Sequence, residues 1–428
     1  MTNRMMLLCS VALIGGNLPG VVAAQDSFSW NGAFIGADVG LGIGSTQRDN
    51  IQSPPDELDE GALGGSGLVG GVFAGYDIEV APGLVFGIEA GLDFFNAEAS
   101  LTDATYADDY EFRSLGAAYA GVRAGATIAP RTLLYGRLAY AAIYSEASDI
   151  PAFDPGNEFL NGYQVAVGLE SEVAENVTLR VEGTYTSAVD RFITGDPDTY
   201  AYSPTHFGAQ AGVAYRFGGD DRGERAALAS TGSWSGVYVG ILGGGLATSS
   251  LNGGMDNLQG TGTEGPASTI VPSYGAYIGL NHEVGGGWVV GVEGEGTMYE
   301  AAYDAIGPAV AGAYDYASSD HKAQVSARLG FLVNPDTLVY GRAGYGLMHI
   351  NPDYDMAEDS TESAYIQAAS AGVGVEAMVN QHALIRVEAL YTTALEEYRF
   401  ADDASVPSMP FYVKPESVEA RVGAAFKF

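Results

Sequence analysis

Residue types that carry out acid–base catalysis or bind metals are sparse and scattered in this sequence. Among the five histidines, the one adjacent Asp–His pair is Asp320–His321, an arrangement that can orient an imidazole as a general base. The pattern H-E-x-x-H, which presents two histidines and a base to zinc, does not occur. A hydrolase would need this pair beside a nucleophile at one rim of the fold, and we predict that the protein is not an enzyme.

Two other patterns could bind small ligands. The run GSGLVG at residues 65–70 matches G-x-G-x-x-G, but a nucleotide site needs a helix after it, and this run leads into the strand-like VGGVFAGYDIEV. The run NPDYDMAED at residues 351–359 groups several acids, which suits Ca²⁺ or Mg²⁺, yet it lacks the glycine of an EF-hand loop. We predict no cofactor. Divalent cations at the acidic loops stay as candidate partners beside the simpler interpretation of solvated charged loops.

The charge balance excludes one large class of partners. The chain carries 53 acidic and 19 basic residues, a formal net charge of −34, and so offers no basic patch for nucleic-acid phosphates. The only lysines are Lys322, Lys414 and Lys427, fewer than a soluble protein of 428 residues normally shows on its surface. We therefore predict no nucleic-acid partner.

Residues 1–24 have the pattern of a secretory signal peptide. Arg4 is their only charge, an apolar run follows it, and Val22 and Ala24 satisfy the small-residue rule for cleavage. The alternative, a membrane-spanning helix, needs about 20 apolar residues, more than this run provides. We predict export with cleavage near Ala24. The only cysteine, Cys9, would leave with the signal peptide.

The segments that must position any site show apolar side chains that alternate with small or charged ones, with a period of two. In GLVFGIEAGLDFF at residues 83–95, apolar side chains occupy one face, and glycine, Val85, Glu89 and Asp93 occupy the other. Similar runs before residue 217 lie roughly at 30–44, 67–79, 84–96, 112–128, 132–145, 160–174, 177–188 and 204–217. Short turns alternate with long acidic loops between them. This pattern predicts an all-β fold, an antiparallel transmembrane β-barrel, because an exported chain can span lipid without helices only as a closed sheet. A soluble β-sandwich is the alternative fold.

The second half of the sequence repeats the first. PRTLLYGR at residues 130–137 returns as PDTLVYGR at 335–342, and LRVEGTYTSA at 179–188 returns as IRVEALYTTA at 385–394. The offset grows from 204 to 211 through changes in the long loops, where insertions are tolerated. We predict an eight-stranded unit at residues 25–217, a polar linker at 218–232 and a second eight-stranded unit at 233–428.

Charged residues on the predicted inward face are kept in both copies. They form six equivalent pairs, which are Glu89/Glu293, Arg123/Arg328, Arg137/Arg342, Glu170/Glu376, Arg180/Arg386 and Glu182/Glu388. Three acids and three arginines per copy could select ions in a pore, or could pair and plug a narrow barrel. We favour the plug, because the set is neutral, small residues dominate the rest of the face, and isolated buried charges are unstable.

The motifs together resemble a known family. WNGAFIG at residues 30–36 and WSGVYVG at 234–240, with the YGR and RVE-x-x-Y elements, resemble the small outer-membrane β-barrel family of α-proteobacterial surface proteins and opacity-like porin-family proteins. The resemblance implies residence in the outer membrane, with lipid, lipopolysaccharide and the outer-membrane assembly machinery as partners. Phe428 looks like the C-terminal signal that this machinery reads. Members usually contain one such unit, and this chain contains two.

Two architectures, with different functions, fit these observations. Two separate eight-stranded barrels would make a structural and surface-interaction protein, whereas one sixteen-stranded barrel would make a porin-like channel for small solutes. Pairing of residues 204–217 with 30–44 would indicate closure within the first copy, and pairing with 234–248 would indicate one large barrel. We favour two barrels. An outer-membrane enzyme stays as a remote third alternative.

Overall fold

The computed structural model describes most of the chain. The described residues are 29–50, 61–103, 108–148, 157–190, 192–194, 200–217, 231–253, 255–256, 261–306, 313–352, 363–399 and 412–428. The predicted signal peptide, most of the predicted linker and all but the first two residues of the acidic run 351–359 lie outside these ranges. No helix among the described residues is long and apolar enough to cross a membrane.

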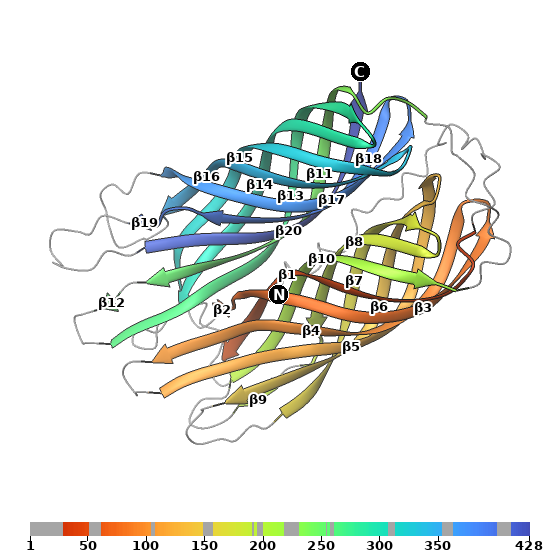
Figure 1. The fold of residues 1–428 in the computed structure, drawn as a ribbon. Coiled ribbons are helices and arrows are strands. Elements are labelled where there is room, and N and C mark those ends of the chain that lie inside the picture. Colours follow the sequence, from red (N-terminus) through yellow and green to blue (C-terminus); the bar gives the residue numbers. More distant parts are fainter. Residues whose placement is uncertain are drawn as a thin grey trace.

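The first copy closes on itself as an antiparallel barrel (Figure 1, red to yellow-green). Its eight long strands are β1 (Gly32–Asn50), β3 (Ser66–Ala81), β4 (Leu84–Asp103), β5 (Asp108–Ala129), β6 (Thr132–Ser148), β7 (Asn157–Ala174), β8 (Val177–Ala188) and β10 (Tyr200–Arg216), with short β2 (Gly61–Leu63) and β9 (Phe192–Thr194) near the long loops. Each long strand pairs with the next, and β10 returns to β1 from Phe34↔Arg216 to Asn50↔Tyr200.

The second copy repeats this arrangement (Figure 1, green to blue). Its long strands are β11 (Gly236–Gly253), β13 (Thr261–Gly285), β14 (Trp288–Ile306), β15 (Ala313–Asn334), β16 (Thr337–Pro352), β17 (Ala364–Asn380), β18 (Ala383–Ala394) and β20 (Tyr412–Lys427), with short β12 (Met255–Asp256) and β19 (Tyr398–Arg399). Strand β20 pairs with β11 from Tyr238↔Lys427 onwards. The sixteen-stranded alternative is therefore wrong, because β10 and β20 each close onto the first strand of their own copy and leave no edge for the other.

The alternation of side chains follows the sequence pattern. In β4, Ile88 is 64% exposed on the outer face while the adjacent Glu89 is 2% exposed inside the barrel. Leu84, Phe86, Leu92 and Phe94 share the exposed outer face. An exposed apolar belt around a closed sheet is what lipid contact requires, so the soluble β-sandwich alternative is also wrong.

The two barrels lie side by side (Figure 1). They contact each other through equivalent residues of the two copies. One apolar cluster joins Leu169, Val181 and Phe207 of the first barrel to Val375, Val387 and Val418 of the second, and these are the same positions in the two copies. A Cβ atom on Gly183 would lie 2.2 Å from the Cβ of Ala420, so the two walls touch closely there. The interface thus has the self-complementary character of a two-fold dimer, although it joins two parts of one chain.

A disulfide between the barrels should form without disturbing either one. The hydroxyls of Thr132 and Thr337, at equivalent positions, are 2.7 Å apart across the interface. In a Cys9→Ala background, we expect Thr132→Cys with Thr337→Cys to oxidise spontaneously. After cleavage at a protease site inserted in the linker, non-reducing electrophoresis should show the two barrels still joined, and the Thr132→Cys single variant should separate. Separation of the double variant would show that the barrels do not pack in this way.

Candidate functional site

The centre of the first barrel is a carboxylate surrounded by arginines. Glu89 on β4 accepts hydrogen bonds from Arg123 (3.2 Å) and Arg180 (3.3 Å to Oε2) and from Arg137. The hydroxyl of Tyr119 donates to the same carboxylate at 2.9 Å. These side chains come from β4, β5, β6 and β8, so the contacts tie much of the barrel wall together across its interior.

Two more inward carboxylates, on β7 and β8, extend this centre. Arg123 reaches Glu170 at 2.8 Å, and Arg137 reaches Glu182 at 2.9 Å. The six residues predicted from the first copy therefore lie within one ion-pair network. We call it the first charge network, and it consists of Glu89, Arg123, Arg137, Glu170, Arg180 and Glu182.

The second barrel has the same centre. Glu293 accepts hydrogen bonds from Arg342 (3.0 Å) and Arg386 (2.7 Å to Oε2), and Arg328 approaches it at 3.3 Å. Arg328 also pairs with Glu376 at 3.1 Å, and Arg342 with Glu388 at 3.1 Å. The structure thus also brings together the second predicted set, which we call the second charge network and which consists of Glu293, Arg328, Arg342, Glu376, Arg386 and Glu388.

Aromatic rings fill much of the space between these charges. The guanidinium carbon of Arg386 lies 3.7 Å from the ring centre of Tyr277, and that of Arg328 lies 4.0 Å from Tyr340. In the first barrel, Arg137 lies 4.2 Å from the ring of Tyr119. Ring faces attract cations, and they take up volume that water would otherwise occupy. The arrangement therefore favours a plug over an ion path.

Sequence comparison between the copies missed several members of the networks, because all of these residues except Arg216, which corresponds to Lys427, have no charged counterpart in the other copy. Among them are Asp38, Asp77 and Arg216 in the first barrel and Glu295, Lys322, Glu419 and Arg421 in the second. For the four residues of the second barrel the signal was paired replacement. Gly91 and Gln210 correspond to Glu295 and Arg421, and Ala117 and Gly208 correspond to Lys322 and Glu419, so in this barrel each added acid arrives with a base.

The two tryptophan motifs close the barrels at the short-turn end. Trp30 is 2% exposed and Trp234 is 1% exposed, and each packs on inward residues of its own barrel. Arg216 donates to the backbone carbonyl of Trp30 at 2.8 Å, and the indole N–H of Trp234 donates to the carbonyl of Pro335 at 2.9 Å. The repeated S-W-x-G motif therefore places a large ring in the base of each barrel.

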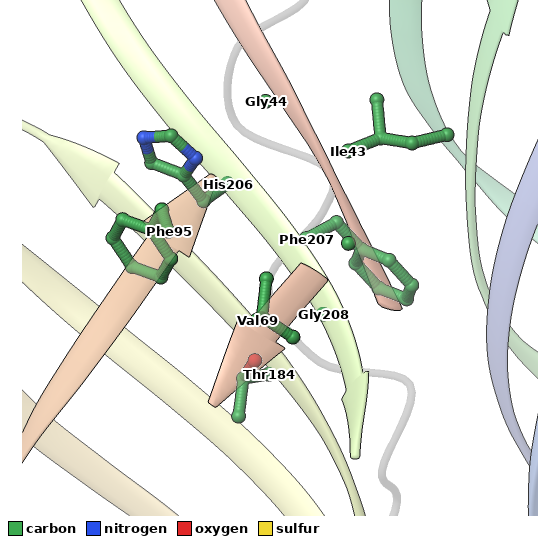
Figure 2. Close-up of a pocket in the computed structure, with 9 residues that line it drawn as sticks. Ile43, Gly44, Val69, Phe95, Thr184, His206, Phe207 and Gly208 are labelled. Atoms are coloured by element: carbon green, nitrogen blue, oxygen red, sulfur yellow. The ribbon is translucent and has the colours of Figure 1, made fainter. Parts of the chain in front are cut away.

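A small pocket lies at the other end of the first barrel (Figure 2). Its walls include Val69, Phe95, Thr184 and His206, and they leave no room for a molecule the size of water. The rings of Phe95 and His206 are stacked, with centres 4.2 Å apart. His206 is the one titratable side chain among the nine lining residues, so the pocket offers no acid–base pair. Val69 belongs to the run at 65–70, which continues as β3 and not as a helix, so the nucleotide interpretation of that run has no support.

The C-terminal residue lies at the short-turn end of the second barrel. The backbone N–H of Phe428 donates to the carbonyl of Val237 at 3.0 Å, and its ring meets Phe426 edge-on at 5.1 Å. The Phe428 side chain is 71% exposed on the outside of the barrel. The ring is accessible there, and its role as an assembly signal stays a prediction.

Comparison with known proteins adds the following findings. A family model described as "Outer membrane protein beta-barrel domain" matches residues 12–217 and again residues 225–426. The 31 kDa outer-membrane immunogenic proteins of Brucella melitensis and Brucella suis are each 26% identical over 208 residues, which covers 46% of this chain and 87% of the relative.

Similar solved structures include an outer-membrane protein, a surface protein and a transporter. OprG from Pseudomonas aeruginosa is 15% identical, and the match covers 47% of this chain and 99% of OprG with a TM-score of 0.31. Neisserial surface protein A is 14% identical, with 43% and 97% coverage and a TM-score of 0.26. The Pseudomonas putida toluene transporter TodX is 11% identical, with 94% and 91% coverage and a TM-score of 0.28.

Proposed function

Because this chain belongs to the outer membrane protein beta-barrel domain family, we propose that it is a structural and surface-presenting component of the outer membrane whose two barrels transport no solute. It is an integral outer-membrane β-barrel protein. The surface we propose for interaction is the end of each barrel at which the strands joined by long acidic connections in the sequence begin and end. Lipid, lipopolysaccharide and the outer-membrane assembly machinery are the partners we propose for it. We also propose that it has no enzyme activity.

The main observation that supports this proposal is the pairing of the inward charges. The side chains of Arg123 and Arg328 are 1% and 2% exposed, and they pair with three and two carboxylates of their own barrels, respectively. A water-filled lumen would leave such groups hydrated, whereas here protein atoms surround them. The buried tryptophans at the base support the same conclusion.

Single-channel recording in planar bilayers tests this proposal. We expect silence from the reconstituted protein at concentrations where a general porin gives frequent steps. Insertion should be verified in parallel, by protease protection of the strands in vesicles made from the same preparation. Large and steady conductance steps from verified protein would overturn the proposal.

A further inference from the structure

Three potential metal ligands meet on the outer face of the second barrel, near its long-loop end. They are Asp320 and His321 on β15 and His349 on β16, and one ligand atom from each lies within 4.8 Å of the other two. The Nδ1 atoms of His321 and His349 are 2.6 Å and 2.8 Å from the same oxygen, Oδ1 of Asp320. The fold therefore places His349, which is distant in the sequence, next to the pair Asp320–His321.

A β-bulge creates this arrangement. Ser319 pairs with Ile350 and Lys322 with Met348, so Asp320 and His321 together oppose His349 alone. A bulge of this kind re-aims a side chain that regular alternation would send to the opposite face. Here it turns Asp320 to the outside, beside His321, while Lys322 stays buried within the barrel.

Two further side chains hold the cluster in place. The hydroxyl of Tyr365 lies 3.0 Å from Nε2 of His321, and the amide of Asn351 donates to Oδ2 of Asp320 at 3.3 Å. The two imidazole rings stack with their centres 4.6 Å apart. Since the carboxylate only accepts, both Nδ1 atoms carry a proton in this arrangement, and with a neutral His321 ring the Tyr365 hydroxyl donates to Nε2. Such outer partners orient ligands in metal sites.

The first barrel shows that the fold does not require this cluster. It has the same bulge, between Ser114 and Gly116, but the positions of Asp320 and His321 hold Leu115 and Gly116. The positions of His349 and Tyr365 hold Tyr144 and Phe159, whose rings pack at 5.0 Å as an ordinary interfacial aromatic pair. The second copy has thus exchanged apolar and aromatic side chains for two imidazoles and a carboxylate on an unchanged backbone pattern.

We propose that Asp320, His321 and His349 bind one divalent transition-metal ion of the zinc class at the outer surface. Imidazole nitrogen and carboxylate oxygen suit Zn²⁺, Cu²⁺ and Ni²⁺, whereas Ca²⁺ and Mg²⁺ prefer sites built from oxygen alone. The ion takes the place of the two Nδ1 protons, which move to the Nε2 atoms as each ring changes tautomer. The Tyr365 hydroxyl then accepts from His321 instead of donating to it.

The partial exposure of the three side chains determines how an ion can reach the cluster. The side chains of His321, His349 and Asp320 are 35%, 14% and 42% exposed, so an ion can arrive from outside without any movement of the barrel. Three protein ligands leave a fourth position for water or for a donor from another molecule. The site is therefore built for reversible binding. The proposal is independent of whether the barrels conduct.

The proposal is tested by calorimetric titration of the full chain with Zn²⁺. The chain carries no polyhistidine tag, and excess Mg²⁺ is present to occupy carboxylate sites. We expect one Zn²⁺ per chain. The variant His349→Tyr, which installs the residue of the first barrel, should weaken binding at least about tenfold, equivalent to about 1.4 kcal/mol. His282→Tyr, at an exposed histidine elsewhere on the same barrel, is the matched control and should bind as the unchanged protein does.

A second readout identifies the ligands. Cu²⁺ bound in place of Zn²⁺ should give a paramagnetic resonance spectrum with coupling to two nitrogens, reduced to one in His349→Tyr. Absence of Zn²⁺ binding in excess Mg²⁺ would overturn the proposal and leave the cluster as a hydrogen-bonded group. Binding that His349→Tyr leaves unchanged, in a variant that still folds, would overturn it as well.

Discussion

Replacing Glu89 with glutamine is expected to lower the free energy of unfolding of the first barrel by about 3–5 kcal/mol. Glutamine keeps the shape of the side chain and removes only its charge. Arg123, Arg137 and Arg180 all contact this carboxylate inside the barrel, so the change leaves three buried guanidinium groups with less compensating charge. Removing one partner of a buried ion pair is far more destabilising than removing an exposed one.

The fluorescence of Trp30 during denaturant unfolding in detergent or lipid vesicles measures this effect. Trp30 is buried in the first barrel, and Trp234→Phe with Trp288→Phe removes the other two tryptophans. Glu175→Gln, at an exposed turn position, is the control and should change stability by less than about 0.5 kcal/mol. An effect of Glu89→Gln as small as that of the control would show that the network is hydrated and that the plug interpretation is wrong.

Strands and network centres could be predicted from the sequence because both depend on local patterns. Alternation with a period of two assigns each residue to a face, and Ile88 and Glu89 lie on the faces that it predicts. The duplication then acts as an internal comparison that identifies inward charges such as Glu89 and Glu293. These charges must find partners inside a narrow barrel, and the structure brings them together.

Closure and the barrel interface could not be predicted in the same way. Strand β10 carries the same alternation whether it pairs with β1 or with β11, so its partner is decided by the whole sheet. Val181 and Val387 look like lipid-facing residues in the sequence, because an apolar surface suits lipid and a second barrel equally well. The bulge that turns Asp320 outward leaves no signal in the alternation of its neighbours.

Lys322 and Glu419 give the second large expected effect, because each is buried and each is the close partner of the other. Glu419 is 0% exposed and Lys322 is 4% exposed, and the ammonium contacts both the carboxylate and the hydroxyl of Thr392, the latter at 3.1 Å. We expect Glu419→Ala to lower the stability of the second barrel by about 3–5 kcal/mol, because it leaves a buried ammonium without its carboxylate. Lys322→Ala should have a smaller effect, since Arg421 remains 3.5 Å from Glu419.

The double variant separates charge pairing from simple loss of volume. The first barrel has Ala117 and Gly208 at these positions and closes in the same way, so the fold tolerates the absence of both charges. We therefore expect Lys322→Ala with Glu419→Ala to be more stable than Glu419→Ala alone, with a coupling energy of about 2 kcal/mol or more. Trp234 fluorescence, in a chain with Trp30→Phe and Trp288→Phe, measures it.

The sign of that coupling discriminates between two physical pictures of the plug. If the side chains mattered only as packed volume, the two substitutions would each remove contacts and their effects would add, or the larger cavity would make the double variant the least stable of the three. If buried charge is what must be balanced, the second substitution relieves the first, as the paired differences between the two barrels indicate. Additive effects within about 0.5 kcal/mol would contradict the electrostatic interpretation.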